Sequence, residues 1–144
     1  MRYRFVLIGL LLVAITLGVS TSVPAQTPVR KVIEITMTSF KFEPNEIRVN
    51  EGDTVLIRLR NADQAGRPHA VASRYLVDIP LTVRGDGRQG VDEGRKFVQV
   101  DASKQAEFEF VAQNRGSYAF ICSVFIHSFA GMTGAIFVRP AGSP

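Results

Sequence analysis

Four side chains with metal-binding donor atoms stand out in the sequence. Cys122, His127 and Met132 fall within one short stretch, CSVFIHSFAGM, and His69 lies well before them. The chain has a single cysteine, two histidines and, after the initiator, two methionines, so these four residues hold nearly all of its soft donors. A thiolate, two imidazoles and a thioether suit a redox-active copper ion, with three strong ligands in a trigonal plane and a weak axial thioether.

The spacing of the four residues suits a single ion. A turn between Cys122 and Met132 can fold over one metal and bring His127 back to it, while His69 arrives from a neighbouring strand. Each residue alone has an ordinary structural interpretation, because buried cysteines and core methionines are common. Zinc is an alternative, since it accepts one cysteine and two histidines with an open fourth position. Methionine suits copper better than zinc, so the set favours one copper ion that cycles between Cu(I) and Cu(II).

Alternating apolar and polar residues predict the strands that must position these ligands. The pattern is clear in VIEITMT, NEIRVN, TVLIRLRN, KFVQVDA and QAEFEFVA, and it is typical of half-buried antiparallel strands. HAVAS predicts a strand that begins at His69, GSYAFICSV one that ends at Cys122, and GAIFV the last strand. Met37 is expected in the core, and Tyr118 in a tyrosine corner. We predict an all-β Greek-key β-sandwich of about seven to eight strands.

The middle of the chain has a weaker pattern. Residues 75–83, YLVDIPLTV, are apolar and suggest extended backbone. Residues 84–95, RGDGRQGVDEGR, are rich in glycine and charge, and we expect a surface loop there.

The N-terminus has the three-part layout of a secretory signal peptide. Arg2 and Arg4 precede an apolar run over residues 5–19, and Val23 and Ala25 occupy the −3 and −1 positions of a cleavage site. The run is shorter than the roughly 20 residues of a membrane span, although an uncleaved anchor is the alternative. We expect residues 1–25 to be the signal, 26–31 a short linker, 32–139 one domain and 140–144 a tail, in an exported and periplasmic protein.

The distribution of charge argues against one class of function. The chain carries a formal charge of +4, and the predicted signal removes two arginines and no acidic residue. The remaining lysines and arginines are scattered, without the basic cluster of a nucleic-acid-binding protein.

The sequence resembles the cupredoxin family, the small blue type 1 copper proteins of the plastocyanin and azurin kind, over residues 32–138. The matching segments are FEPNEIRVNEGDTV, AGRPHAV and GSYAFICSVFIHSFAGMTGAIFV. The resemblance implies that His69, Cys122, His127 and Met132 are the copper ligands. Ala70 departs from the family, which often has an asparagine there that ties the two ligand segments together. The loop also looks a little like a dinuclear copper loop, but Ile126 stands where a second cysteine would be needed.

These observations lead us to expect a one-electron carrier, and not an enzyme. The alternative is a copper-binding protein for storage, delivery or resistance, although no exposed Met-rich or His-rich run is present. Catalysis at a second copper would need further histidines, and both are already assigned. Apolar residues surround His127 and suggest docking of redox protein partners, namely Val124, Phe125, Ile126, Phe129 and Ala130. We expect a monomer, with no membrane span after signal cleavage.

Overall fold

A computed structural model describes residues 28–144 of the chain. The predicted signal peptide and the first residues of the predicted linker lie outside this range. The described residues form eleven strands and no helix, in the order β1 (Arg30–Thr38), β2 (Lys41–Glu43), β3 (Glu46–Asn50), β4 (Thr54–Asn61), β5 (His69–Ser73), β6 (Thr82–Gly85), β7 (Gly87–Asp92), β8 (Arg95–Val100), β9 (Gln105–Val111), β10 (Gly116–Ile121) and β11 (Thr133–Arg139). Accordingly, residues 28–144 contain no apolar helix long enough to cross a bilayer.

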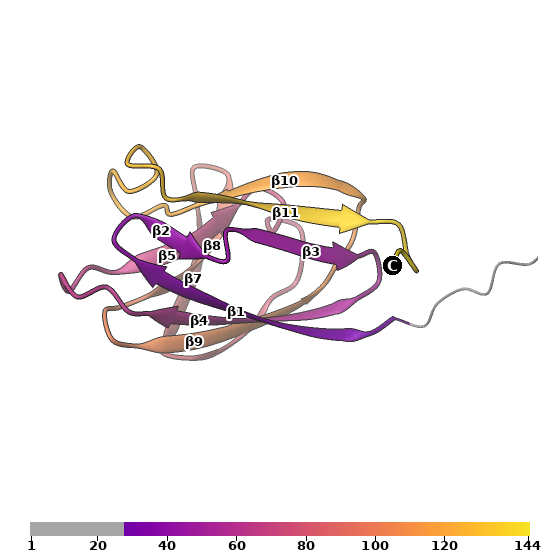
Figure 1. Cartoon of the computed structure of the whole chain (residues 1–144), viewed down its shortest axis with the longest axis horizontal. Coiled ribbons are helices and arrows are strands. Elements are labelled where there is room, and N and C mark those ends of the chain that lie inside the picture. The colour runs from indigo at the N-terminus through magenta and orange to yellow at the C-terminus, as the bar shows by residue number, and fades with distance from the viewer. Residues whose placement is uncertain (1–27) are drawn as a thin grey trace, which may run out of the picture.

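The strands pack as two layers, which confirms the predicted all-β sandwich (Figure 1). One sheet has the order β2-β1-β4-β9-β6, and the other has the order β3-β11-β10-β5-β8-β7. Most neighbours are antiparallel, while β1 with β4 and β3 with β11 are parallel. The loop between β10 and β11 lies at one end of the sandwich, and the C-terminus lies toward the other (Figure 1).

The core follows from the alternation along the strands. In β4, Val55, Ile57 and Leu59 are buried while Arg58 and Arg60 are exposed. In β9, Ala106, Phe108 and Phe110 are buried in the same way. Side chains of one pleat face the opposite sheet, so these residues and Met37 meet in one continuous core, as the pattern predicted.

The prediction of a surface loop over residues 84–95 was wrong. This segment contains the second half of β6 and all of β7. These strands pair with β9 and β8, respectively, and form edges of the two sheets. Neither of these edge strands has a buried residue, so their sequences lack apolar alternation and resemble a loop. Gly90 lies against the ring of Phe97, where a Cβ atom would collide with it. These short strands and β2 raise the count above the predicted seven to eight.

The structure bears on the predicted start of the domain and on the predicted tyrosine corner. The first strand begins at Arg30, inside the segment that was predicted as linker, and its first residues pair with Thr54 and Val55. The Tyr118 hydroxyl donates to the carbonyl of Asn114 at 2.7 Å, which is the backbone contact of a tyrosine corner.

Candidate metal centre

Two strands bring the distant histidine to the cysteine. His69 is the first residue of β5, and Cys122 directly follows β10. These strands are antiparallel neighbours, with Ile121 opposite Ala72. The backbone N–H of Ala70 lies 3.5 Å from the Cys122 sulfur. The two segments therefore meet at one end of the sandwich although they are far apart in sequence.

The loop from Cys122 to Met132 is closed by its own backbone hydrogen bonds. The N–H of His127 donates to Val124, the N–H of Met132 to His127, and the N–H of Cys122 to Met132, at 3.0–3.1 Å. Gly131 has a φ of 92°, a left-handed conformation that glycine adopts without steric cost. The loop thus turns His127 back toward the cysteine that starts it.

The three strong donors converge on one point. Nδ1 of His69 lies 3.8 Å from the Cys122 sulfur, and Nδ1 of His127 lies 3.4 Å from it. All three donor atoms lie within 4.8 Å of one another. Metal bonds to histidine nitrogen and cysteine sulfur are about 2.0–2.3 Å long, which separates ligands in a shared shell by roughly 3.5 Å. These side chains therefore form a candidate site for a single metal ion.

Met132 lies at the same end of the molecule. Its side chain is fully buried in the cluster that contains Cys122, and its backbone is bonded to both Cys122 and His127. The structure thus brings together all four residues that the sequence singled out. Their role as ligands remains a prediction.

Two of the donors have pKa values shifted toward their uncharged forms. Burial raises the pKa of the Cys122 thiol, although the N–H groups of Ala70 and Val124 oppose this shift. Burial also lowers the pKa of His127, and the nearby His69 and Arg67 lower it further. A metal ion that binds here must displace the thiol proton, because the thiolate is the form that ligates metals.

A buried aspartate that sequence reasoning missed contacts one of the histidines. Nε2 of His69 lies 2.8 Å from Oδ2 of Asp63, and both side chains are fully buried. Burial raises the pKa of Asp63, but hydrogen bonds from His69, Ala65 and Arg67 outweigh it and lower the pKa to about 2. Asp63 stands in a polar loop, NADQAGRP, where nothing in the sequence distinguishes it from a solvated turn residue.

Other contacts tie the ligand segments together where the family's asparagine is replaced by Ala70. The Ser73 hydroxyl of β5 donates to the Ala119 carbonyl of β10 at 2.7 Å. The amide of Asn61 donates to the carbonyls of Arg67 and Val100 at 2.9 and 3.0 Å. The Ser73 bond joins the two ligand segments without the asparagine, and the Asn61 bonds fix the loop that leads into His69.

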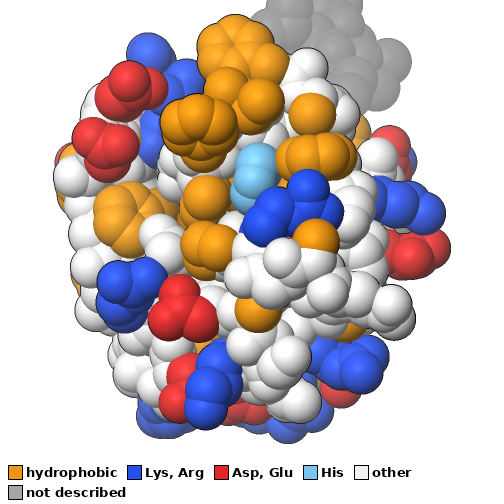
Figure 2. Space-filling view, turned by 90° about the vertical axis from the view of Figure 1, so that its left-hand side faces the viewer, with side chains coloured by type: hydrophobic (Ala, Val, Ile, Leu, Met, Phe, Trp, Pro, Cys, Tyr) orange, Lys and Arg blue, Asp and Glu red, His pale blue; other side chains and the backbone are white. Residues whose placement is uncertain are grey.

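The surface over the site is apolar. His127 is 5% exposed, whereas His69 is fully buried. Figure 2 shows an imidazole among hydrophobic side chains, with a basic side chain at their border. The apolar collar defined by residues 124–126 and 129–130 includes Phe125 and Phe129, which are 85% and 91% exposed. Val124 differs from the rest of the collar, because it packs against the core.

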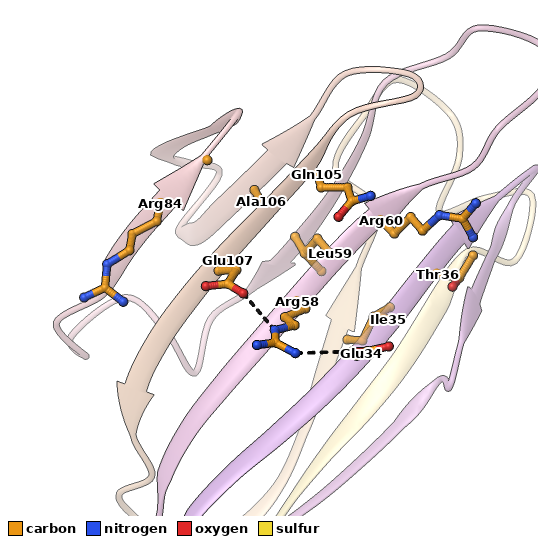
Figure 3. A pocket seen from close by; sticks show the side chains of 11 residues that line it. Glu34, Ile35, Thr36, Arg58, Leu59, Arg60, Arg84, Gln105, Ala106 and Glu107 are labelled. Carbon is orange, nitrogen blue, oxygen red and sulfur yellow. Dashed lines mark hydrogen bonds and ion pairs between the residues drawn. The ribbon is translucent and has the colours of Figure 1, made fainter.

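A separate groove lies on the outer face of the sheet with the order β2-β1-β4-β9-β6 (Figure 3). Arg58 lies between Glu107 and Glu34 there and pairs with both carboxylates, at 2.7 and 3.4 Å. Arg60 and Arg84 point along the same face (Figure 3). The groove contains neither a histidine nor a cysteine, and its features are those of a solvated sheet surface.

Solved structures with the same fold include several auracyanins. Auracyanin B matches with a TM-score of 0.59 and 17% identity over 83% of this chain and 96% of that one. A dithionite-reduced auracyanin from the photosynthetic bacterium Roseiflexus castenholzii matches with a TM-score of 0.59 and 19% identity over 76% and 97%. Auracyanin A, a "blue" copper protein from Chloroflexus aurantiacus, matches with 0.55 and 21% over 76% and 99%. At these identities the likeness concerns the fold alone.

Sequence comparison gives the family directly. A search of curated proteins found no significant match. The sequence profile of the cupredoxin-like domain, however, matches residues 8–138, which is most of the chain. With a two-layer β-sandwich and a histidine–cysteine–histidine cluster at one end, this chain belongs to the cupredoxin-like domain family.

Proposed function

We propose that this protein binds one copper ion through His69, Cys122, His127 and Met132 and carries single electrons between redox partners. The observation that carries the proposal is the convergence of two imidazole nitrogens on the Cys122 sulfur, at 3.8 and 3.4 Å. The sulfur and Met132 are fully buried. A thiolate, two imidazoles and a thioether are the donors of a blue-copper electron-transfer site, and copper would supply the Cu(I)/Cu(II) couple.

The protein contributes rigidity. The histidine that starts β5 and the cysteine that follows β10 are attached to paired strands. The loop between Cys122 and Met132 is closed by backbone bonds. Side chains held in this way move little when the charge of a bound ion changes, so electron exchange needs little rearrangement of the protein.

We propose that partners dock on the apolar collar. Phe125 has a φ of 47°, a left-handed conformation that is unusual for a bulky residue. The strained backbone holds an 85% exposed ring beside the site. An exposed apolar patch of this kind is typical of an interaction surface. His127 reaches the surface within the collar and would offer the shortest path for an electron.

We also propose that the protein works outside the cytoplasm, in the periplasm. The basic, apolar and small-residue segments of the N-terminus support export. Full burial of the single cysteine protects its thiol in an oxidising compartment. Mass spectrometry of the exported protein tests this, since a chain that begins at Gln26 supports cleavage and one that retains Arg2 contradicts it.

A copper titration of residues 26–144 tests the proposed function. We expect one equivalent of Cu(II) to produce an intense thiolate-to-copper absorption band, which ascorbate bleaches and an oxidant restores. Stopped-flow electron exchange with a soluble redox protein should then be fast. A colourless protein that binds only Cu(I) would support copper storage or delivery instead, and a protein that binds neither ion would contradict both functions.

A further inference from the structure

The strongest feature that the proposed function leaves unused is the buried Asp63. Its side chain is 0% exposed and accepts hydrogen bonds from several directions. The backbone N–H of Ala65 donates to Oδ1 at 2.7 Å, and the Arg67 guanidinium lies 3.0 Å from Oδ2. The backbone N–H of Asp63 itself donates to the Asn61 side chain at 3.0 Å. These donors hold the carboxylate in place and favour its charged form where it meets His69.

The contact with His69 selects one form of the imidazole. An ionised carboxylate can only accept hydrogen bonds, so its partner must be a donor. In neutral His69 the proton therefore belongs on Nε2, which lies 2.8 Å from Asp63. The opposite nitrogen, Nδ1, is then unprotonated and faces the Cys122 sulfur. A lone pair on Nδ1 is what a metal ion requires, and hydrogen bonds from the other ring nitrogen commonly set this choice in metal sites.

The negative charge of Asp63 acts in the same place. Its oxygen lies one imidazole ring away from the candidate metal site, with no exposed surface to screen it. Charges in such an environment interact more strongly than in water. Cu(II) carries one more positive charge than Cu(I), so a fixed carboxylate favours the oxidised state.

Arg67 opposes this effect from the solvent side. Its guanidinium pairs with Asp63 and also lies over the ring of Phe40, 4.6 Å from the ring centroid. Phe40 in turn packs edge-on against His127, with centroids 5.1 Å apart. Arg67 is thus connected to both histidines, to one through a carboxylate and to the other through an aromatic ring. Its side chain is 32% exposed, so solvent screens its charge more than that of Asp63.

We infer that Asp63 is a positioning residue of the metal site, which orients His69 for the metal and shifts the copper couple toward Cu(II), while Arg67 partly offsets its charge. This inference rests on the proposed copper site.

The decisive experiment compares Asp63→Asn and Arg67→Gln with the wild type, by titrating Cu(II) and Cu(I) separately. Asp63→Asn should lower Cu(II) affinity about 10–100-fold and Cu(I) affinity less, which raises the reduction potential by about 59 mV for each tenfold change in their ratio. Arg67→Gln should change the ratio in the opposite direction by a smaller factor. If Asp63 and Arg67 had only packing roles, the two substitutions would not shift the reduction potential in opposite directions.

The matched control is Asp53→Asn, which removes another buried carboxylate at the far end of β4. It should leave the ratio of Cu(II) to Cu(I) affinity unchanged. A second readout needs no copper: nitrogen NMR of the metal-free wild type should find the His69 proton on Nε2.

The outcomes separate the two proposals. A wild type without the blue absorption band contradicts the proposed function, whereas a blue wild type whose potential is unchanged by Asp63→Asn overturns the inference alone. If Asp63→Asn fails to fold, Arg67→Gln and the NMR measurement decide. An unchanged or increased potential in Arg67→Gln, or a proton on Nδ1 of His69, would overturn the inference.

Discussion

Two buried aspartates at opposite ends of β4 show how one residue type serves two purposes. Asp53 directly precedes the strand and Asp63 follows it closely. Asp53 accepts hydrogen bonds from the backbone N–H groups of Asn50 and Val29, at 2.8 and 3.4 Å, and lies 3.3 Å from the Lys31 ammonium. Asp63 instead contacts the imidazole of His69 and the guanidinium of Arg67.

The difference lies in the partners and not in the burial. The carboxylate of Asp53 closes a turn and holds the start of β1, so its contacts stabilise the backbone at that end. The carboxylate of Asp63 holds a side chain that could bind metal. A buried charge needs compensating contacts wherever it lies, and the kind of group that supplies them indicates whether the position serves the fold or the site.

The largest expected effect comes from removing the thiol. Cys122→Ser should abolish the intense visible band of the copper-loaded protein, because no other thiolate exists in the chain. The opposite end of the sandwich should remain intact, so circular dichroism of the metal-free variant should match that of the wild type. A strong band that survives the substitution, measured by visible absorption at one equivalent of Cu(II), would contradict the assignment.

Asp53→Asn should lower the stability of the fold and leave the copper spectrum intact, the reverse of Cys122→Ser. We expect the free energy of unfolding of the metal-free protein to fall by about 1–3 kcal/mol at neutral pH, because a buried acceptor of backbone hydrogen bonds is replaced. Urea unfolding measures this loss. The visible spectrum after copper loading should not change. A changed spectrum would contradict the assignment of Asp53 to the fold and not to the metal site.

The same variant has a defined pH dependence. Burial raises the pKa of Asp53, but hydrogen bonds from Asn50 and Val29 and the contact with Lys31 outweigh it, so the pKa lies below its ordinary value of 3.8. A lowered pKa stabilises the folded state above the pKa of the unfolded chain, and this stabilisation is lost as pH falls toward the folded value. The difference between the wild type and Asp53→Asn should therefore be larger at about pH 6 than at about pH 3. Equal differences would show that the charge is not responsible.

Ile126→Lys should slow electron exchange with a redox protein and leave the visible spectrum of the copper-loaded protein unchanged. Ile126 is 54% exposed in the collar beside His127. A charge on an apolar docking surface adds a desolvation cost, and about 1.4 kcal/mol would slow electron exchange tenfold. Stopped-flow mixing with a soluble redox protein measures the rate, and the visible spectrum serves as the control. A substitution at the exposed Val91 of β7, Val91→Lys, should leave the rate unchanged. Equal rates for Ile126→Lys and the wild type would exclude docking at this position.

The smallest effect is expected at the tyrosine corner. Tyr118→Phe removes the hydrogen bond to the Asn114 carbonyl and should lower the free energy of unfolding by about 0.5–1.5 kcal/mol. Stacking on Tyr75, whose ring centroid is 4.3 Å away, should persist. Because Tyr118 lies in β10 before the ligand loop, the copper spectrum should not change. Thermal unfolding measures the loss. A stability equal to that of the wild type would show that the Tyr118 hydrogen bond does not stabilise the fold.

The central strands and the candidate metal-binding residues could be identified from the sequence because their signals are local. Alternation in β1, β4 and β9 depends only on the strand period, and the donor types of Cys122 and His127 can be read directly. The edge strands β6 and β7 could not, because pairing with β9 and β8 determines them and their own residues show little alternation.

The sequence by itself determined the sandwich, its main core residues and the donor atoms available to a metal. These depend on residue type and on periodicity, which every strand carries in itself. Only the tertiary structure decided that Nδ1 of His69 faces the cysteine and that Asp63 lies behind the ring. The reason is that the loop after β4 must fold back, held by the Asn61 amide, before a carboxylate and an imidazole six residues apart can meet in a buried site.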